Sequence, residues 1–226
     1  MIKLSKRLST IASFVRSDAK LVDIGCDHAL LDLYLLQNNP KLKAIGVDVK
    51  EGALNQALNN VEKYNMKGKL DLRLGDGLEP VKKEEIDTVV ISGLGSYKIV
   101  EILNNGLEKL TNVSDIVVQT NSDHYFLRKK VCLLGFYIAG ETLVKENNII
   151  YLVVHFKKGK KRYSRKDYIL GPILRIEKSK LYKENIIKEL KKKEILYDLI
   201  PRRYFLKRIM LKRQILKLKT SIKQKN

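Results

Sequence analysis

Three carboxylates near the start of the chain could hold a cationic ligand that carries a ribose. Asp23 lies near the end of one apolar run and Asp48 follows a second, while Asp27 stands two residues after Gly25. An acid at the tip of a second strand can accept two hydrogen bonds from a ribose diol. The turn lacks the later glycines of Gly-x-Gly-x-x-Gly, and Asp27 would repel a pyrophosphate. The pattern therefore favours S-adenosylmethionine, with its ammonium and sulfonium groups, over NAD.

The turn that joins these two runs also contains residues that suit structural roles. Asp23 and Asp27 would suit a helix cap or the positive end of a helix dipole. His28 would either pack on the ligand or make a structural hydrogen bond. We predict that this turn and the second strand tip bind the cofactor through Asp23, Gly25, Cys26, Asp27, His28, Asp48 and Val49.

A second glycine-containing turn follows the third apolar run. Asp76 stands there between two glycines, the second of them Gly77, and Leu78 comes next. An acid at such a turn commonly meets the amino group of adenine, with the leucine against the ring. A tight turn alone would also favour Asp between glycines. We predict cofactor contacts for Asp76, Gly77 and Leu78.

The turn after the fourth run favours a ring nitrogen as the methyl acceptor. It reads Ser92-Gly93, whereas enzymes that methylate an exocyclic amine typically carry Asn/Asp-Pro-Pro-aromatic at this place. A ring nitrogen such as adenine N1 has an in-plane lone pair, so the enzyme mainly supplies position. Carbon and hydroxyl acceptors stay open as alternatives. We predict that Ser92 and Gly93 contact the cofactor. The residues expected nearest the reacting groups are Asp27, His28, Ser92 and Asn121, the last at the end of the fifth run.

These turns can meet only if the apolar runs lie side by side as parallel strands. Near-continuous apolar runs that alternate with helical patterns predict such a sheet, covered on both faces. The expected strands are 20–25, 43–48, 69–75, 86–92 and 114–120, and the expected helices are 29–38, 51–64, 97–109 and 124–134, after a short helix within 4–15. Runs 135–144 and 149–157 indicate an antiparallel hairpin. The fold class is therefore α/β, a Rossmann-like class I methyltransferase sheet of five parallel strands plus a terminal hairpin, in residues 1–157.

Nearly all the net charge of +20 lies in the last third of the chain. Residues 157–226 hold 25 of the 45 Lys and Arg but only 6 of the 25 Asp and Glu. A basic composition without a partner should affect the whole surface, yet the first two thirds are balanced. The segment therefore predicts a module that binds a polyanion, with nucleic acid favoured over a membrane surface. Candidate RNA contacts are Lys160, Lys161, Arg162, Arg165, Arg175, Arg202, Arg203 and Arg208.

Helical patterns dominate this basic extension, residues 158–226. After a linker over 157–165, a helix is expected to begin at Gly171-Pro172, to end near Leu199 and to resume after Pro201 as far as Lys223. The seam expected between the two antiparallel, coiled-coil-like helices consists of Leu211, Ile215, Leu218 and Ile222. Ordinary packing between the two helices explains that seam without an oligomer, and we expect a monomer.

Other features limit the class of protein. No apolar run approaches the roughly 18 residues of a membrane span, and the first residues lack a signal-peptide pattern. Cys26 and Cys132 form no Cys-x-x-Cys, and the three histidines have no metal-site spacing. We expect a cytoplasmic protein with reduced thiols and no metal.

The chain resembles the bacterial tRNA (adenine-N1)-methyltransferases that modify adenine 22, the TrmK-like family. The segments that carry the resemblance are 4–8 with 11–12, 23–29, 73–78, 91–95 and 119–121, together with the helical extension. The resemblance implies that Arg7 approaches the cofactor carboxylate and that the C-terminal helices bind tRNA. Adenine 22 as the target comes from this resemblance alone.

The chain departs from the family pattern at three places. Leu30-Leu31-Asp32 stands where the family usually has Tyr-Leu-Pro, which removes a stacking or hydroxyl contact near the base. Ser96 replaces the last glycine of Gly-Met-Gly-Gly, and Thr120 replaces the proline of Gln-Pro-Asn. These changes keep a second hypothesis open, a catalytically weakened RNA-binding protein on the same fold.

The sequence predicts an S-adenosylmethionine-dependent methyltransferase that acts on N1 of an adenine in tRNA. Because N1 lies on the Watson–Crick edge, the base must be unpaired or flipped out to react. A methyltransferase for a protein or small molecule, with the basic tail on an acidic partner, is a further alternative. An NAD oxidoreductase fits the glycine pattern least.

Overall fold

The computed structural model of the protein describes residues 2–223 and divides into two compact units. The division falls between Lys161 and Arg162, four residues beyond the boundary expected from the charge pattern. No helix within residues 2–223 is both long enough and apolar enough to cross a membrane.

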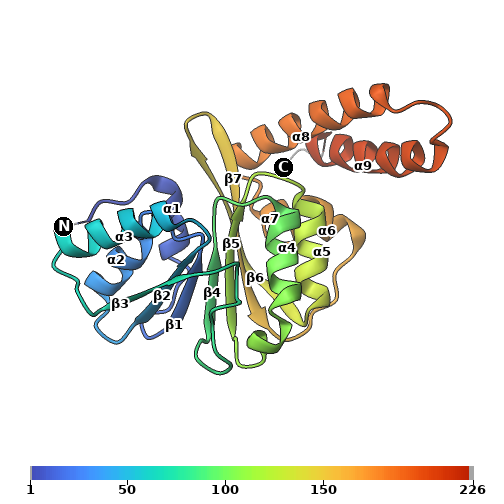
Figure 1. Cartoon of the computed structure of the whole chain (residues 1–226). Helices are drawn as coiled ribbons and strands as arrows, with labels where there is room; N and C mark the ends of the chain where they lie inside the picture. Colours follow the sequence, from blue (N-terminus) through green and yellow to red (C-terminus); the bar gives the residue numbers. More distant parts are fainter. Residues whose placement is uncertain (1, 224–226) are drawn as a thin grey trace. The chain divides into compact units, whose positions relative to one another are not determined.

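The first unit is built on a seven-stranded sheet with the order β3-β2-β1-β4-β5-β7-β6 (Figure 1). Its strands are β1 (Lys20–Ile24), β2 (Lys43–Asp48), β3 (Leu70–Leu74), β4 (Thr88–Ile91), β5 (Asp115–Thr120), β6 (Phe136–Glu146) and β7 (Ile149–Lys158). The first five strands are parallel, and β7 runs antiparallel to both β5 and β6. The predicted fold class is confirmed. The strand order reverses between β1 and β4, the place where open α/β sheets bind ligands.

Helices cover both faces of this sheet. They are α1 (Lys6–Ala12), α2 (Leu30–Asn38), α3 (Glu51–Lys63), α4 (Ser96–Asn105) and α5 (His124–Leu133), with a short 3₁₀ turn at Leu107–Leu110. The first three pack together on one face, and α4 and α5 pack together on the other (Figure 1). The prediction of a helix over 97–109 is wrong in its last turn, because the α-helix ends at Asn105 and Gly106 separates it from the 3₁₀ turn. A side chain at that position would overlap Leu78, so the glycine lets the helix end against the core.

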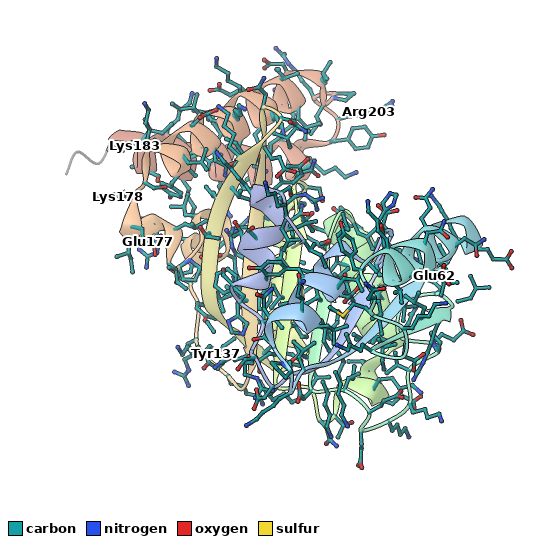
Figure 2. The ribbon with its side chains drawn as sticks, turned by 90° about the vertical axis from the view of Figure 1, so that its left-hand side faces the viewer. Glu62, Tyr137, Glu177, Lys178, Lys183 and Arg203 are labelled. Atoms are coloured by element: carbon teal, nitrogen blue, oxygen red, sulfur yellow. The ribbon has the colours of Figure 1, made fainter. Side chains whose placement is uncertain are left out.

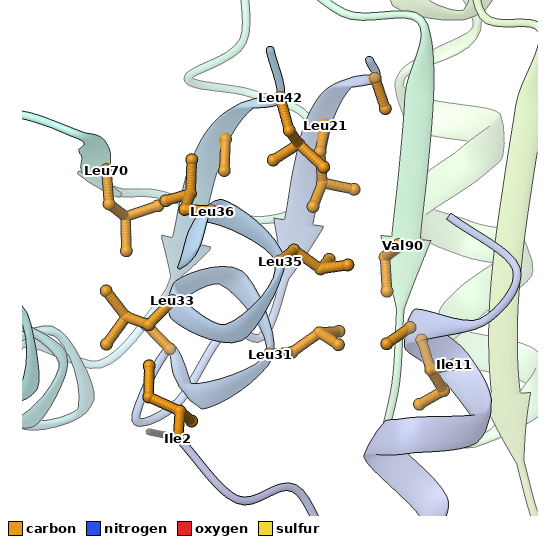
Figure 3. Packing of buried hydrophobic residues seen from close by; sticks show 14 of the residues in the cluster. Ile2, Ile11, Leu21, Leu31, Leu33, Leu35, Leu36, Leu42, Leu70 and Val90 are labelled. Carbon is orange, nitrogen blue, oxygen red and sulfur yellow. The ribbon is translucent and has the colours of Figure 1, made fainter. Parts of the chain in front are cut away.

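The core of the first face forms where α2 meets β1 and β2. Leu31, Leu33 and Leu35 are buried on α2, and Leu21 is buried on β1 (Figure 3). Ile11 of α1 joins the same cluster. Because strands covered on both faces can be apolar throughout, this packing explains the near-continuous apolar runs of the sequence.

The second unit is helical, but its helices begin and end differently from the prediction. They are α6 (Arg165–Leu170), α7 (Leu174–Glu177), α8 (Lys180–Leu199) and α9 (Phe205–Lys223). The single helix predicted from Gly171-Pro172 to Leu199 is wrong, because Lys178 adopts a left-handed conformation (φ 47°) and Ser179 caps a new helix. A capping box between Ser164 and Asp167 starts α6 in the stretch where the linker was expected to end.

The seam between α8 and α9 is confirmed for three of its four predicted positions. Leu211, Ile215 and Leu218 are buried, whereas Ile222 is 41% exposed. The end of α9 lies opposite the start of α8, because the Ser221 hydroxyl lies 3.2 Å from the hydroxyl of Tyr182, the third residue of α8. Only the first turn of α8 is therefore available to cover Ile222.

Candidate active site

A cavity of about 460 Å³ lies at the carboxyl ends of β1, β2 and β4. Helix α1, the loops after β1 and β3, the first turns of α2 and α3, and the first two turns of α4 complete its walls. The predicted cofactor residues that line it are Arg7, Asp23, Gly25, Cys26, Asp27, His28, Asp48, Val49, Asp76, Gly77, Ser92 and Gly93. The fold thus brings together predicted residues that lie as far apart in the sequence as Arg7 and Gly93.

Two predicted site residues are not part of this wall. Leu78 is 2% exposed and packs in the core below Gly106 rather than in the cavity. Asn121 is exposed and does not line the cavity. Instead, Gln119 on β5 connects to the site: its Oε1 accepts hydrogen bonds from the Gly93 N–H (3.1 Å) and from Arg7 Nη1 (2.7 Å).

The loop after β1 has an unusual backbone. Gly25, Asp27 and Ala29 have φ angles of 75°, 50° and 53°, although a side chain disfavours this left-handed region. The N–H groups of Gly25 and Cys26 both donate to the carbonyl of Val47 (2.8 and 3.1 Å). The loop is therefore held on the end of β2, which is how strained backbone persists at binding sites.

Asp48 holds this loop through its carboxylate. Its Oδ2 accepts the Asp27 N–H (3.2 Å) and its Oδ1 accepts the Lys50 N–H (3.0 Å). An ionised carboxylate has about four acceptor positions, so both oxygens retain capacity for ribose hydroxyls. Val49, which is 59% exposed, forms an apolar part of the same wall.

A buried acidic cluster lies beneath the cavity. Asp23 is 3% exposed, and its Oδ1 has no hydrogen-bond partner in the described part of the chain. Burial and the nearby Asp48 raise the pKa of Asp23 to about 7, against the opposing effect of Arg7. Asp32 on α2 is fully buried, and burial and the charge of Asp23 raise its pKa. Burial and these three acids also raise the pKa of the Cys26 thiol, so Cys26 is a neutral wall residue.

The cluster fits a cation. An unpartnered, buried carboxylate oxygen on a cavity wall is stabilised by a ligand that brings a positive charge and a donor. The ammonium group of S-adenosylmethionine supplies both. A pyrophosphate would meet Asp23, Asp27 and Asp48 with like charge, so the residues present fit the adenosyl-sulfur cofactor.

Arg7 joins α1 to the far edge of the cavity. Its side chain bonds Gln119, its Nε lies 3.7 Å from Glu146 Oε1, and its backbone N–H donates to Glu146 Oε2 (3.0 Å). The guanidinium therefore remains beside the cavity, where it can meet a carboxylate.

Sequence reasoning missed two residues of α4 that line the cavity. Lys98 reaches Asp76 (Nζ–Oδ2 3.3 Å), and Ile102 fills the space that a side chain at Gly77 would need. Their spacing of four residues places them on one face of the helix, which is the signal that could have identified them.

The catalytic candidates differ in their exposure. Ser92 is half-buried in the wall, whereas the side chains of Asp27 and His28 are 70% and 48% exposed and approach each other to 3.6 Å. No group of three or more His, Cys, Asp or Glu among residues 2–223 could hold a metal ion.

The residues predicted to bind RNA also differ in their contacts. The exposed ones are Lys160, Lys161, Arg162, Arg202 and Arg203. Arg203 lies in the loop between α8 and α9 (Figure 2). Arg165 is half-buried, and Arg175 is paired with Asp167 (Nε–Oδ1 2.7 Å). Arg208 donates to the Tyr197 carbonyl (2.8 Å), so it has a structural contact within its own unit.

The fold and the cavity together define a class I methyltransferase fold. The sheet is open and ends in a hairpin, carboxylates lie at the ends of β1 and β2, and glycine turns follow β1, β3 and β4. More particularly, the chain belongs to the TrmK family, tRNA (adenine(22)-N(1))-methyltransferase, whose sequence model matches residues 21–221.

Individual relatives agree with this family. The tRNA (adenine(22)-N(1))-methyltransferase of Bacillus subtilis is 30% identical over 88% of this chain and 86% of its own. A Streptococcus pneumoniae structure in complex with S-adenosyl-L-methionine is 32% identical, with a TM-score of 0.87, over 97% of this chain and 100% of its own. M. capricolum TrmK in complex with S-adenosyl-homocysteine is 29% identical, with a TM-score of 0.81, over 97% of both chains.

Proposed function

We propose that this protein transfers a methyl group from S-adenosylmethionine to N1 of an adenine in tRNA, at position 22. The observation that carries the proposal is the cavity wall of Asp23 and Asp48, which suits an ammonium group and a ribose, in a chain whose family is named for this reaction. We assign methyl transfer to residues 1–157 and tRNA binding to residues 158–226.

The cofactor would be held by charges that already lie in place. Asp48 accepts the ribose hydroxyls, Asp23 accepts the ammonium group, and Arg7 meets the carboxylate. When bound, S-adenosylmethionine supplies an electrophilic methyl group on a sulfonium. Ser92 and Gly93 form the wall toward β4, where the acceptor would approach.

The acceptor would need positioning more than activation. Adenine N1 carries its own lone pair, so no side chain has to remove a proton before attack. His28 and Asp27 are exposed enough to meet a flipped base, and either could accept the proton that N6 later loses. We propose that the protein acts as a monomer.

The basic unit would bind the tRNA backbone. Five of the predicted contacts are exposed, and such contacts fix position without reading much sequence. A tRNA substrate places the proposed reaction in the cytoplasm.

The test is to incubate the protein with methyl-labelled S-adenosylmethionine and total tRNA, and to map modified nucleosides. We expect 1-methyladenosine at position 22, loss of transfer in Asp48→Ala, and unchanged transfer in the control Asp18→Ala, whose side chain is 62% exposed. Tight tRNA binding without transfer would instead identify a catalytically weakened RNA-binding protein. Label in a protein or small-molecule fraction would identify another substrate class.

A further inference from the structure

An exposed aromatic ring, Tyr97, stacks on a half-buried one, Phe126, at the sheet edge that carries the cavity. The rings of Tyr97 and Phe126 lie 4.3 Å apart, centroid to centroid, with an angle of 29° between their planes. Tyr97 lies in the first turn of α4 and Phe126 in the first turn of α5. The pair does not complete the core, because Tyr97 is 64% exposed.

Tyr97 is adjacent in the sequence to a residue of the cavity wall. Lys98, the next residue after Tyr97, lines the cavity. Ser92, at the start of the loop that leads from β4 into α4, lines it as well. No lining residue comes from β5 or from any later element that the structure describes. We therefore expect a substrate to approach past the starts of α4 and α5, where Tyr97 is exposed.

A hydroxyl network holds the two helix starts together. Ser122 Oγ accepts the Ser96 N–H (2.7 Å) and lies 3.2 Å from both Ser96 Oγ and Thr120 Oγ1. The side chain of Asp123 accepts the Phe126 N–H (3.0 Å) at the cap of α5. The rings are therefore preorganised, which lowers the entropy cost of stacking on a ligand.

The surroundings of the rings are cationic. Lys130 Nζ lies 5.8 Å from the centre of the Phe126 ring, and Lys129 Nζ lies 6.0 Å from that of Tyr125. Neither ammonium group pairs with a carboxylate in the described part of the chain. A second copy of this chain would bring like charges together, whereas a polyanion with flat, apolar faces would be attracted.

We infer that Tyr97 and Phe126 form a stacking platform for an unpaired base of the RNA substrate at the mouth of the cavity. The inference rests on the proposed function for the identity of the substrate. Aromatic rings beside free lysines are the combination that binds unpaired nucleotides, because every base has a π face and every linkage a phosphate.

The absence of tryptophan from the sequence permits a direct test. Tyr97→Trp keeps a stacking ring and introduces a single fluorescent reporter, and Leu133→Trp places a matched reporter at the last residue of α5, where Leu133 is 68% exposed. We expect tRNA to quench the first reporter and leave the second unchanged. Heparin, a polyanion without bases, should quench neither. An unquenched Tyr97→Trp signal at saturating tRNA would overturn the inference.

Activity supplies a second measurement. Tyr97→Ala should lower kcat/KM for tRNA by about 10-fold or more, as expected for one lost base stack, while Tyr97→Trp and Leu133→Ala remain near wild type. The affinity for S-adenosylmethionine should not change in any of these variants. Unchanged kcat/KM in Tyr97→Ala contradicts the platform. Quenching by tRNA in a protein that transfers no methyl group would retain the platform and refute the proposed function.

Discussion

Asp23 combines nearly complete burial with a position on the cavity wall. Its unpartnered oxygen and its pKa of about 7 have one cause, the removal of a carboxylate from water beside another acid. A cationic ligand reverses that penalty. Affinity for the cofactor is therefore coupled to the protonation of this side chain.

We expect S-adenosylmethionine to bind more tightly as the pH rises from about 6 to about 7.5. Asp23 must be ionised to hold an ammonium group, and with a pKa of about 7 it is mostly protonated at the lower pH. Above this window the ligand's own α-amino group, with a pKa of about 8, begins to lose its proton. Calorimetric titration in buffers with different ionisation enthalpies should detect proton release on binding.

Asp23→Asn is the matching variant. It should bind the cofactor about 10- to 100-fold more weakly, as expected for the loss of a charge-assisted hydrogen bond, and should lose the pH dependence below pH 7.5. A wild-type affinity that stays constant across this window would contradict the role of Asp23.

Asp32→Asn should stabilise the protein more at pH 8 than at pH 5. The pKa of Asp32 is raised in the folded state by burial and by Asp23, so the folded chain holds a proton that the unfolded chain releases. The free energy of unfolding therefore falls as the pH rises above the ordinary pKa of 3.8, and the variant removes that loss. We expect a gain of about 1–3 kcal/mol at pH 8. Thermal unfolding at both pH values measures it.

Asp18→Asn provides the control, because the Asp18 side chain is 62% exposed. Its unfolding temperature should be close to wild type at either pH. An equal shift for Asp32→Asn at both pH values would mean that its ionisation does not affect stability.

The sequence allowed most of these residues to be predicted, for a physical reason. Asp23 and Asp48 follow apolar runs, and the ends of parallel strands must meet at one edge. Asp32 could not be assigned in this way, because one acid in the run Leu-Leu-Asp-Leu does not reveal whether its side chain faces water. Leu78 and Asn121 were placed in the site from sequence adjacency alone, and only the fold shows that one lies in the core and the other outside the cavity.

Among the helices and strands, the sheet was more predictable than the helix ends. Apolar runs and alternation identify strands that are buried on both faces. The helix break at Gly106 depends on its close contact with Leu78, and the break at Lys178 depends on a left-handed backbone conformation. Neither feature changes the apolar periodicity of the sequence much. The short helix α6 depends on its capping box, a local signal within a charged stretch.

The contact between α8 and α9 includes a testable structural role for Arg208. Its Nη1 donates to the carbonyls of Tyr197 and Ile200, and its guanidinium lies 4.0 Å from the centre of the Tyr197 ring. Arg208→Lys keeps the charge but loses this geometry, so we expect about 2 kcal/mol less stability for the helical pair. Thermal unfolding followed by circular dichroism measures it.

The matched variant is Arg203→Lys, in the exposed loop between the same helices. It should unfold at the wild-type temperature. Equal unfolding temperatures for the two variants would show that the carbonyl contacts of Arg208 contribute nothing.

For the chain as a whole, the division at Lys161 separates two kinds of surface. The first unit contains the cavity, and its residues 1–156 are nearly neutral, whereas residues 157–226 carry most of the positive charge. We expect a protein that ends after Lys161 to bind S-adenosylmethionine normally but to lose tRNA methylation at least 100-fold.

The intact protein should also lose kcat/KM for tRNA steeply as the salt concentration rises, because phosphate contacts release counterions. Cofactor affinity, measured in the same buffers, serves as the control. Full turnover of tRNA by the shortened chain would show that the basic helices do not bind the substrate.

The hydroxyl network at the starts of α4 and α5 has a consequence for how substitutions within it combine. Ser96 and Thr120, two positions where it departs from the family pattern, lie 3.4 Å apart, Oγ to Oγ1. A glycine at the first position or a proline at the second would remove one hydroxyl and leave the other with Ser122 Oγ, 3.2 Å away, as its remaining hydroxyl neighbour. Because both residues belong to one hydrogen-bond network, the stability effects of replacing them are expected to be non-additive in a double-mutant cycle.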